Sequence, residues 1–222
     1  MTGRGAALFC LFGLLAVLGL VVPACTQPPE GSPEWHLERA QTFANKGQYE
    51  EAIAEYTAVI EARPNEATAY VNRAAAYAAL EQYEEVISDT TKAISLDPSL
   101  ALAYVNRAFA YNSLGQYDLA ITDSTKAIEI DRSLPNAYVN RAYAYTRLGK
   151  WNLAVADCNR AIELDEKLAL PYFYRAQAYL ALELVAEARA DLEKFVSLTD
   201  NPTLSEKAAQ QLRELPEETP AE

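Results

Sequence analysis

The sequence contains few of the residues on which catalytic and metal sites depend. Its 222 residues include one histidine, His36, together with 3 cysteines and 8 glycines. No nucleotide-binding loop, dinucleotide fingerprint or metal-binding cysteine pair is present, and no alternating strand pattern appears. A lone imidazole is far more often a surface or packing residue than a catalyst. The sequence therefore argues against an enzyme and predicts no catalytic residue, no metal and no cofactor.

Positive charge is also scarce. The chain has 19 lysines and arginines against 31 aspartates and glutamates, which gives a net charge of −12 at pH 7. Such a charge repels nucleic acid and anionic lipid head groups. We therefore expect no nucleic-acid partner.

What the sequence does contain is an internal repeat. The stretches 70–77, 104–111 and 138–145 read YVNRAAAY, YVNRAFAY and YVNRAYAY, and each begins 34 residues after the previous one. A fixed period of this size indicates one supersecondary unit that is copied and stacked. Extending the register in both directions gives five units: 33–66, 67–100, 101–134, 135–168 and 169–202.

Each unit carries the apolar pattern of two helices. The eighth place is always alanine, and the eleventh is always aromatic. The alanines are Ala40, Ala74, Ala108, Ala142 and Ala176, and the aromatic residues are Phe43, Tyr77, Tyr111, Tyr145 and Tyr179. The apolar residues of each half are spaced by three and four positions, as one face of a helix requires. We expect the small residue to let the two helices approach closely. At the seventeenth place we expect Trp151 to be buried between units.

Turn residues separate the two halves of a unit. Gly47, Gly115 and Gly149 stand where a helix ends in a left-handed residue. Glu81 and Glu183 replace this glycine in units two and five. If the turn keeps its conformation there, each glutamate costs about 1 kcal/mol of stability.

These residues resemble the tetratricopeptide repeat family over roughly residues 33 to 202, most specifically in the segment LGQYDLAITDSTKAIEID from Leu114 to Asp131. The resemblance implies an all-α fold, a right-handed α-α superhelical solenoid of five tetratricopeptide repeats. The alternative is an ordinary helical bundle with accidental similarity. A C-terminal capping helix is predicted over 203–215, with a capping box formed by Thr203 and Glu206, followed by an acidic tail over 216–222. Its apolar stripe consists of Leu204, Ala208, Leu212 and Leu215.

The N-terminus has the shape of a secretory signal peptide over 1–24, with one basic residue and an apolar run from Ala6 to Val22. The sequence Val22-Pro23-Ala24-Cys25 resembles the lipobox of bacterial lipoproteins. That resemblance implies a lipid on Cys25, with residues 25–32 forming the lipidated cysteine and a linker. It therefore implies attachment to a lipid bilayer of the bacterial cell envelope. Two alternatives remain: ordinary cleavage after Ala24, giving a soluble periplasmic or secreted protein, or an uncleaved signal anchor.

Two further features concern stability rather than function. Cys158 falls on the packed face of a second helix, which predicts a small buried thiol. Each unit has an arginine at its seventh place and an aspartate or glutamate sixteen residues later. We expect the two side chains to form an ion pair within the unit. The pairs are Arg39 with Glu55, Arg73 with Asp89, Arg107 with Asp123, Arg141 with Asp157 and Arg175 with Asp191.

In the tetratricopeptide repeat family the first helices of the units line a concave surface. The resemblance therefore implies a peptide-binding groove here. Three carboxamides one repeat apart, Asn72, Asn106 and Asn140, are predicted to pair with a peptide backbone, because an amide both donates and accepts hydrogen bonds. The accompanying groove residues are Val71, Val105, Val139, Phe109, Tyr143, Phe173 and Tyr174. The alternative is that the three asparagines are relics of repeat duplication.

Two functions are consistent with these features. The first is a membrane-tethered scaffold that binds a protein or peptide partner in the concave groove. The second is a structural role, in which the protein self-associates into homo-oligomers without a peptide ligand.

Overall fold

A computed structural model of the chain describes residues 28–216, and its regular secondary structure over that range consists of eleven helices. The helices are α1 (Pro33–Asn45), α2 (Tyr49–Ala62), α3 (Ala67–Ala79), α4 (Tyr83–Leu96), α5 (Ala101–Ser113), α6 (Tyr117–Ile130), α7 (Pro135–Arg147), α8 (Trp151–Leu164), α9 (Ala169–Ala181), α10 (Val185–Leu198) and α11 (Pro202–Glu214). The predicted signal peptide, Cys25 and most of the acidic tail lie outside the described residues.

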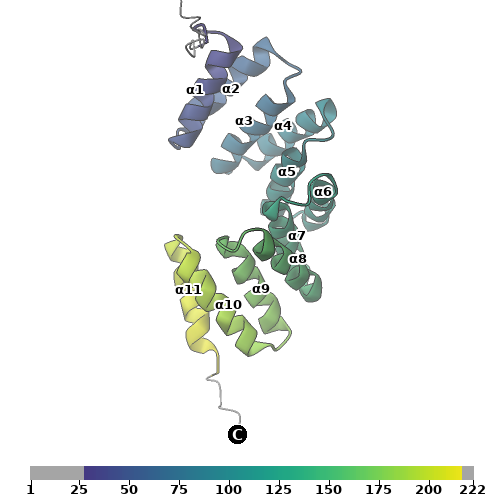
Figure 1. Cartoon of the computed structure of the whole chain (residues 1–222), viewed down its shortest axis with the longest axis vertical. Coiled ribbons are helices and arrows are strands. Elements are labelled where there is room, and N and C mark those ends of the chain that lie inside the picture. Colours follow the sequence, from purple (N-terminus) through teal and green to yellow (C-terminus); the bar gives the residue numbers. More distant parts are fainter. Residues whose placement is uncertain (1–27, 217–222) are drawn as a thin grey trace, which may run out of the picture.

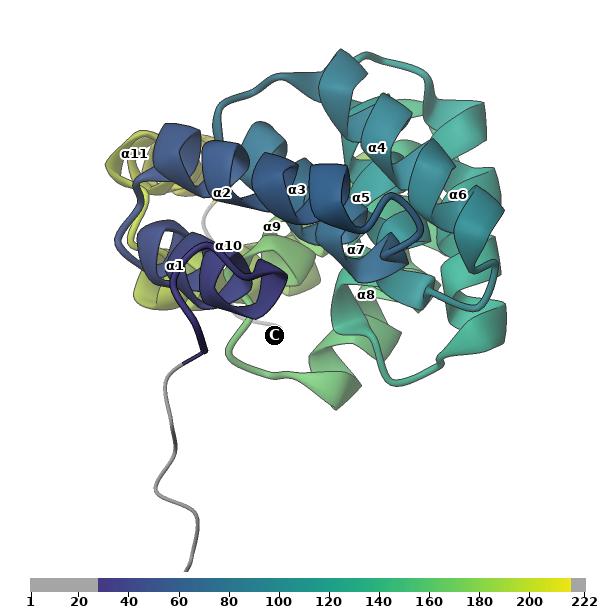
Figure 2. The same cartoon turned by 90° about the horizontal axis from the view of Figure 1, so that it is seen from above.

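The first ten helices form five hairpins that stack one on the next. Each helix packs against its sequence neighbours, from α1 on α2 through to α10 on α11. Figure 1 shows the hairpins following one another from the top of the molecule to the bottom along a curved path. In the view from above, α4 and α6 lie on the outside of the curve, with α5 and α7 inside it (Figure 2). The prediction of an all-α superhelical solenoid with a C-terminal capping helix is confirmed.

The turn within each hairpin has the geometry that the glycines predicted. In unit one, the Gln48 N–H donates to the Phe43 carbonyl and the Gly47 N–H donates to the Ala44 carbonyl, which is a Schellman motif. The left-handed residue has φ of 74° at Gly47, and the same conformation recurs at Glu81 with φ of 58° and at Glu183 with φ of 63°. Both glutamates therefore adopt a backbone conformation that favours glycine.

The hydrophobic core is divided into small clusters at the contacts within and between hairpins. Ala40, Ala74, Ala108, Ala142 and Ala176 have no exposed surface, as the close approach of paired helices requires. Cys158 is also fully buried, and burial raises the pKa of its thiol, so the prediction of a small buried thiol is confirmed. Trp151 corrects the sequence reasoning: it begins α8 and is only half-buried, with its ring near Gly149.

The last helix closes the C-terminal end of the stack. Ala208 of α11 is buried against Phe173 and Phe195 of unit five, and the rest of the predicted apolar stripe packs on the same cluster. The predicted capping box is wrong, because the helix begins one residue earlier than expected. Asn201 is its N-cap and accepts a hydrogen bond from the Leu204 N–H at 3.0 Å, and Pro202 occupies the first turn.

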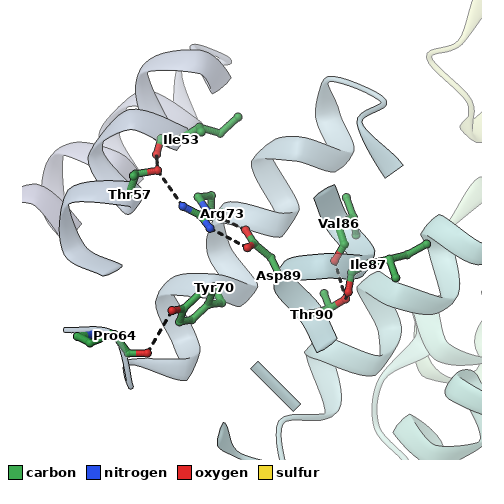
Figure 3. A network of polar contacts seen from close by, with 9 residues as sticks. All are labelled: Ile53, Thr57, Pro64, Tyr70, Arg73, Val86, Ile87, Asp89 and Thr90. Atoms are coloured by element: carbon green, nitrogen blue, oxygen red, sulfur yellow. Dashed lines mark hydrogen bonds and ion pairs between the residues drawn. The ribbon is translucent and has the colours of Figure 1, made fainter. Parts of the chain in front are cut away.

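The repeated ion pairs form as predicted within each unit, and those of units two to five also reach the unit before. In unit two, Arg73 donates from Nε and Nη2 to the two carboxylate oxygens of Asp89, both at 2.7 Å. Its Nη1 donates to Thr57 Oγ1 in the preceding hairpin at 2.9 Å (Figure 3). The same arrangement recurs with Arg107 on Asp123 and Thr91, Arg141 on Asp157 and Thr125, and Arg175 on Asp191 and Asn159.

These four ion pairs differ from an ordinary surface pair. The carboxylates of Asp89, Asp123, Asp157 and Asp191 are buried, and each is bound at both oxygens. A bidentate, largely desolvated pair holds its geometry, and losing one partner leaves a buried charge unpaired. The pair of Arg39 and Glu55 in unit one is more exposed, so its contribution is smaller.

Within residues 28–216, no helix is both long and apolar enough to cross a membrane.

Candidate functional site

The first helices of the hairpins form the inner face of the curve. Helix α3 contacts α5, α5 contacts α7, and α7 contacts α9, in addition to the contacts along the chain. Helices on the inside of a curved stack are brought closer together than those outside, so these contacts identify the concave face. This face carries three pockets.

The loop-side pocket has a volume of about 500 Å³ and lies between α3, α5 and the loop that precedes α7. The central pocket, of about 240 Å³, lies between α5, α7 and α9. The cap-side pocket, of about 380 Å³, lies between α7, α9 and α11. Tyr143, Leu170 and Tyr174 line both the central and the cap-side pocket, so these two pockets adjoin.

The predicted groove residues are distributed unevenly over the pockets. Asn72 and Val71 line the loop-side pocket, whereas Asn106 and Val105 line none of the three. The central pocket brings together the largest group of predicted residues: Phe109, Val139, Asn140, Tyr143 and Tyr174. Phe173 lines the cap-side pocket.

Burial limits what the predicted apolar residues offer a ligand. Val71, Val105 and Val139 belong to the core clusters between hairpins, and Phe173 packs against Phe195. By contrast, the Phe109 side chain is 42% exposed. The exposed apolar surface of the groove therefore comes mainly from Leu102 in the loop-side pocket, Phe109 in the central pocket and Leu170 in the central and cap-side pockets.

The three asparagines are not equivalent. Asn140 already uses its amide within the protein, because its Nδ2 donates to the Val105 carbonyl at 3.0 Å and joins α7 to α5. The side chains of Asn72 and Asn106 are half-buried and form no hydrogen bond with any other residue of the described range. Two of the three carboxamides therefore remain available to a ligand.

The structure adds a buried amide that sequence reasoning missed. Asn112 Nδ2 donates to the Asn140 backbone carbonyl at 2.8 Å, and its side chain lines the central pocket. Asn112 Oδ1 is buried and has no hydrogen-bond partner among residues 28–216. Asn112 occupies the twelfth place of its unit, one of the places that faces the groove in tetratricopeptide repeats, so its position was a usable signal.

The wall between the central and cap-side pockets is aromatic and positively charged. The Tyr143 and Tyr174 rings lie with their centroids 5.2 Å apart, and burial raises the pKa of Tyr174. The Arg147 guanidinium donates to the Tyr143 hydroxyl at 2.9 Å and lies 5.2 Å from the Tyr117 ring centroid. The hydrogen bond to Tyr143 raises the pKa of Arg147.

The described residues contain no cluster of three His, Cys, Asp or Glu side chains that could hold a metal ion. The central and cap-side pockets are lined by aromatic and aliphatic side chains and amides, with Arg147 and Lys207 in the cap-side pocket.

Three protein-family models match the chain. One described as tetratricopeptide repeat matches residues 99–167, one described as TPR repeat matches 40–81, and a second tetratricopeptide repeat model matches 67–100. Together they span residues 40–167, which is more than half of the chain. The chain therefore belongs to the tetratricopeptide repeat family.

Solved structures share this fold at low sequence identity. A crystal structure of MamA is 21% identical with a TM-score of 0.63, covering 80% of this chain and 94% of that one. A tetratricopeptide repeat protein of Thermus thermophilus is 18% identical with a TM-score of 0.68, covering 82% and 100%. YrrB, described as having an unusual peptide-binding site, is 19% identical with a TM-score of 0.61, covering 82% and 94%. No curated protein matches the chain.

Proposed function

We propose that the protein is a membrane-tethered interaction scaffold whose concave groove holds an extended peptide segment of a partner protein. The observation that carries this proposal is the row of three pockets along the first helices, in which apolar walls alternate with amides that have unused hydrogen-bonding groups. The peptide-binding site for which YrrB is described supports the proposal, because that protein has the same fold.

An extended peptide suits this surface for a chemical reason. Each peptide unit presents one N–H and one carbonyl, and a carboxamide can pair with both whatever side chain follows. Asn72 and Asn106 stand one repeat apart with free amides, while Leu102 and Phe109 offer exposed apolar side chains on α5. Amides would therefore hold the backbone, and the pockets would select side chains.

The test is a comparison of asparagine variants. Peptides are selected from a displayed random library on the full chain in detergent and then titrated against the variants. Asn72→Ala with Asn106→Ala removes up to four hydrogen bonds, at about 0.5–1.5 kcal/mol each, so binding should weaken by about 2–6 kcal/mol with little change in stability. Asn140→Ala is the matched control and should lower stability instead, because its amide joins α7 to α5. Unchanged affinity in the double variant would mean that the two asparagines are relics of duplication.

The tether rests on residues 1–25, which lie outside the described part of the chain. Its support is the apolar run from Ala6 to Val22, the Ala24-Cys25 that follows it, and the linker that continues to residue 32. Two or three acyl chains hold a protein on a bilayer without a spanning helix, since each buried methylene contributes about 0.8 kcal/mol. Cys25→Ser should abolish incorporation of labelled fatty acid. Absence of label in the unchanged protein would refute lipidation.

Self-association is a second candidate, favoured by one specific observation. Leu119 and Leu153 occupy the same place in units three and four, on the second helices α6 and α8, and both are about half exposed. The other units carry Glu51, Glu85 and Glu187 there. Replacing both leucines by glutamate should dissociate an oligomer, as light scattering would show, and an already monomeric protein would exclude this role.

A further inference from the structure

The central pocket has the size and walls of a socket for one aromatic side chain. An engineered cavity of about 150 Å³ lined by apolar side chains can hold benzene, and the central pocket measures about 240 Å³. Phe109, Tyr143 and Tyr174 line it, and the Phe109 ring is the most exposed of the three. Offset or edge-to-face ring contacts with an entering aromatic group are therefore available on more than one side.

Asn112 places a buried hydrogen-bond acceptor in the central pocket, and this acceptor requires a donor from the ligand. The Asn112 amide is oriented by its hydrogen bond to the Asn140 carbonyl, which takes the Nδ2 donor. The amide oxygen Oδ1 is therefore the atom that remains without a partner. Oδ1 accepts hydrogen bonds but cannot donate, and a buried acceptor without a donor is costly. Because Oδ1 is buried in the empty groove, a ligand reaches it only when a side chain of the pocket turns aside. An entering ring that carries an N–H group satisfies this acceptor, whereas a phenyl ring does not.

The adjoining cap-side pocket carries positive charge, which favours a negatively charged ligand. Arg147 and Lys207 line it, and neither forms an ion pair within residues 28–216. No aspartate or glutamate lines the central or the cap-side pocket, although the whole chain has a net charge of −12. Two unpaired cations on a strongly acidic protein favour an anionic ligand at this point.

We propose that the central pocket receives a tryptophan side chain from an acidic segment of the partner peptide. The indole N–H donates to Asn112 Oδ1, and carboxylates beside the tryptophan pair with Arg147 and Lys207. This inference rests on the proposed function, since it names the ligand class of the same groove. Indole fits the acceptor well because its nitrogen only donates.

The experiment uses four fluorescein-labelled peptides and the full chain in detergent, with binding followed by fluorescence anisotropy. The core of the first peptide is Gly-Glu-Trp-Glu-Gly. The second replaces tryptophan by phenylalanine, the third replaces both glutamates by lysine, and the fourth replaces tryptophan by alanine. We expect the first to bind about tenfold more tightly than the second, because one buried hydrogen bond is lost. In Asn112→Leu this preference should disappear. Equal binding of the first two peptides by the unchanged protein would overturn the proposal.

The charge requirement is tested with a matched pair of variants. Arg147→Gln with Lys207→Gln should weaken binding of the first peptide by about three- to tenfold at low salt, and by less at high salt. Arg132→Gln with Lys92→Gln makes the same change in net charge at exposed positions outside both pockets and should have little effect. An equal loss in both pairs would refute a local anion site.

The outcome also separates this inference from the proposed function. If library-selected peptides bind in the groove while the tryptophan peptide does not, only the tryptophan inference fails. If no peptide of either kind binds, both fail.

Discussion

Replacing Glu81 by glycine should make the protein more stable, although it removes a side chain. Glu81 has φ of 58°, at the place where Gly47, Gly115 and Gly149 have φ between 70° and 74°. A residue with a Cβ lowers the stability of the folded state by about 1–2 kcal/mol when its backbone lies in this left-handed region. Glycine in turn loses about 0.4–1 kcal/mol more through the entropy of the unfolded chain. The difference predicts a gain of about 1 kcal/mol in the free energy of unfolding.

Little packing energy is at stake in this exchange. Glu81 is exposed and forms no ion pair with the other described residues, and a Cβ placed at the equivalent Gly47 would meet nothing within 4 Å. Urea unfolding followed by circular dichroism gives the measurement, and a gain of about 1 kcal/mol corresponds to a rise in melting temperature of roughly 2–4 °C for a chain of this size.

The matched control is Glu84→Gly, at an exposed position inside α4. There the backbone is helical and the acidic side chain lies in the first turn, so glycine should destabilise by about 0.5–1 kcal/mol or more. Glu183→Gly, in the same turn of unit five, should behave like Glu81→Gly. If Glu81→Gly destabilises the protein as much as Glu84→Gly does, then the left-handed turn in unit two carries no strain and the reasoning is wrong.

Three other predictions follow from the packing. Arg107→Ala should lower the free energy of unfolding in urea by about 3–5 kcal/mol, because it leaves the buried Asp123 unpaired. Arg39→Ala, in the more exposed pair of unit one, should lower it by no more than about 1 kcal/mol. Equal losses would contradict the distinction between buried and exposed ion pairs. Trp151→Ala should cost about 1–2 kcal/mol, below the roughly 3–5 kcal/mol typical of a core aromatic, since the ring is half-buried; a larger loss would return Trp151 to the core. Cys158 should resist thiol reagents in the folded protein and react after unfolding, with the site mapped by mass spectrometry, because burial raises the pKa of its thiol; labelling of the native protein would show that α8 opens.

The repeat itself explains why much of the fold could be predicted from the sequence. A period of 34 residues places the alanine at the eighth position of every unit in the same surroundings. The five copies are therefore five observations of one packing arrangement. The turns were equally accessible, since glycine at three of five equivalent positions indicated a left-handed residue at the other two. The pairs of arginine and acid also followed from a constant spacing.

Features that occur once were harder to predict. The start of α11 was misplaced although the sequence contains a signal for it, because Asn201 is a preferred N-cap residue and Pro202 suits the first helical position. The asparagines show the opposite difficulty, because identical residues in equivalent places differ: the Asn140 amide donates to the Val105 carbonyl, whereas the amides of Asn72 and Asn106 form no such bond. The copied pattern concealed this difference.

The arginine that joins each hairpin to the one before it has a consequence for how such a chain can grow. Arg73, Arg107 and Arg141 each need a hydroxyl sixteen residues earlier and a carboxylate sixteen residues later. A duplicated block of 34 residues carries both halves of this connection, so the new junction is complete from the start. An insertion of another length within a helix between the arginine and either partner changes that spacing. Gain or loss of whole units is therefore the change in length that this architecture tolerates best, and the groove can lengthen by one set of side chains at a time.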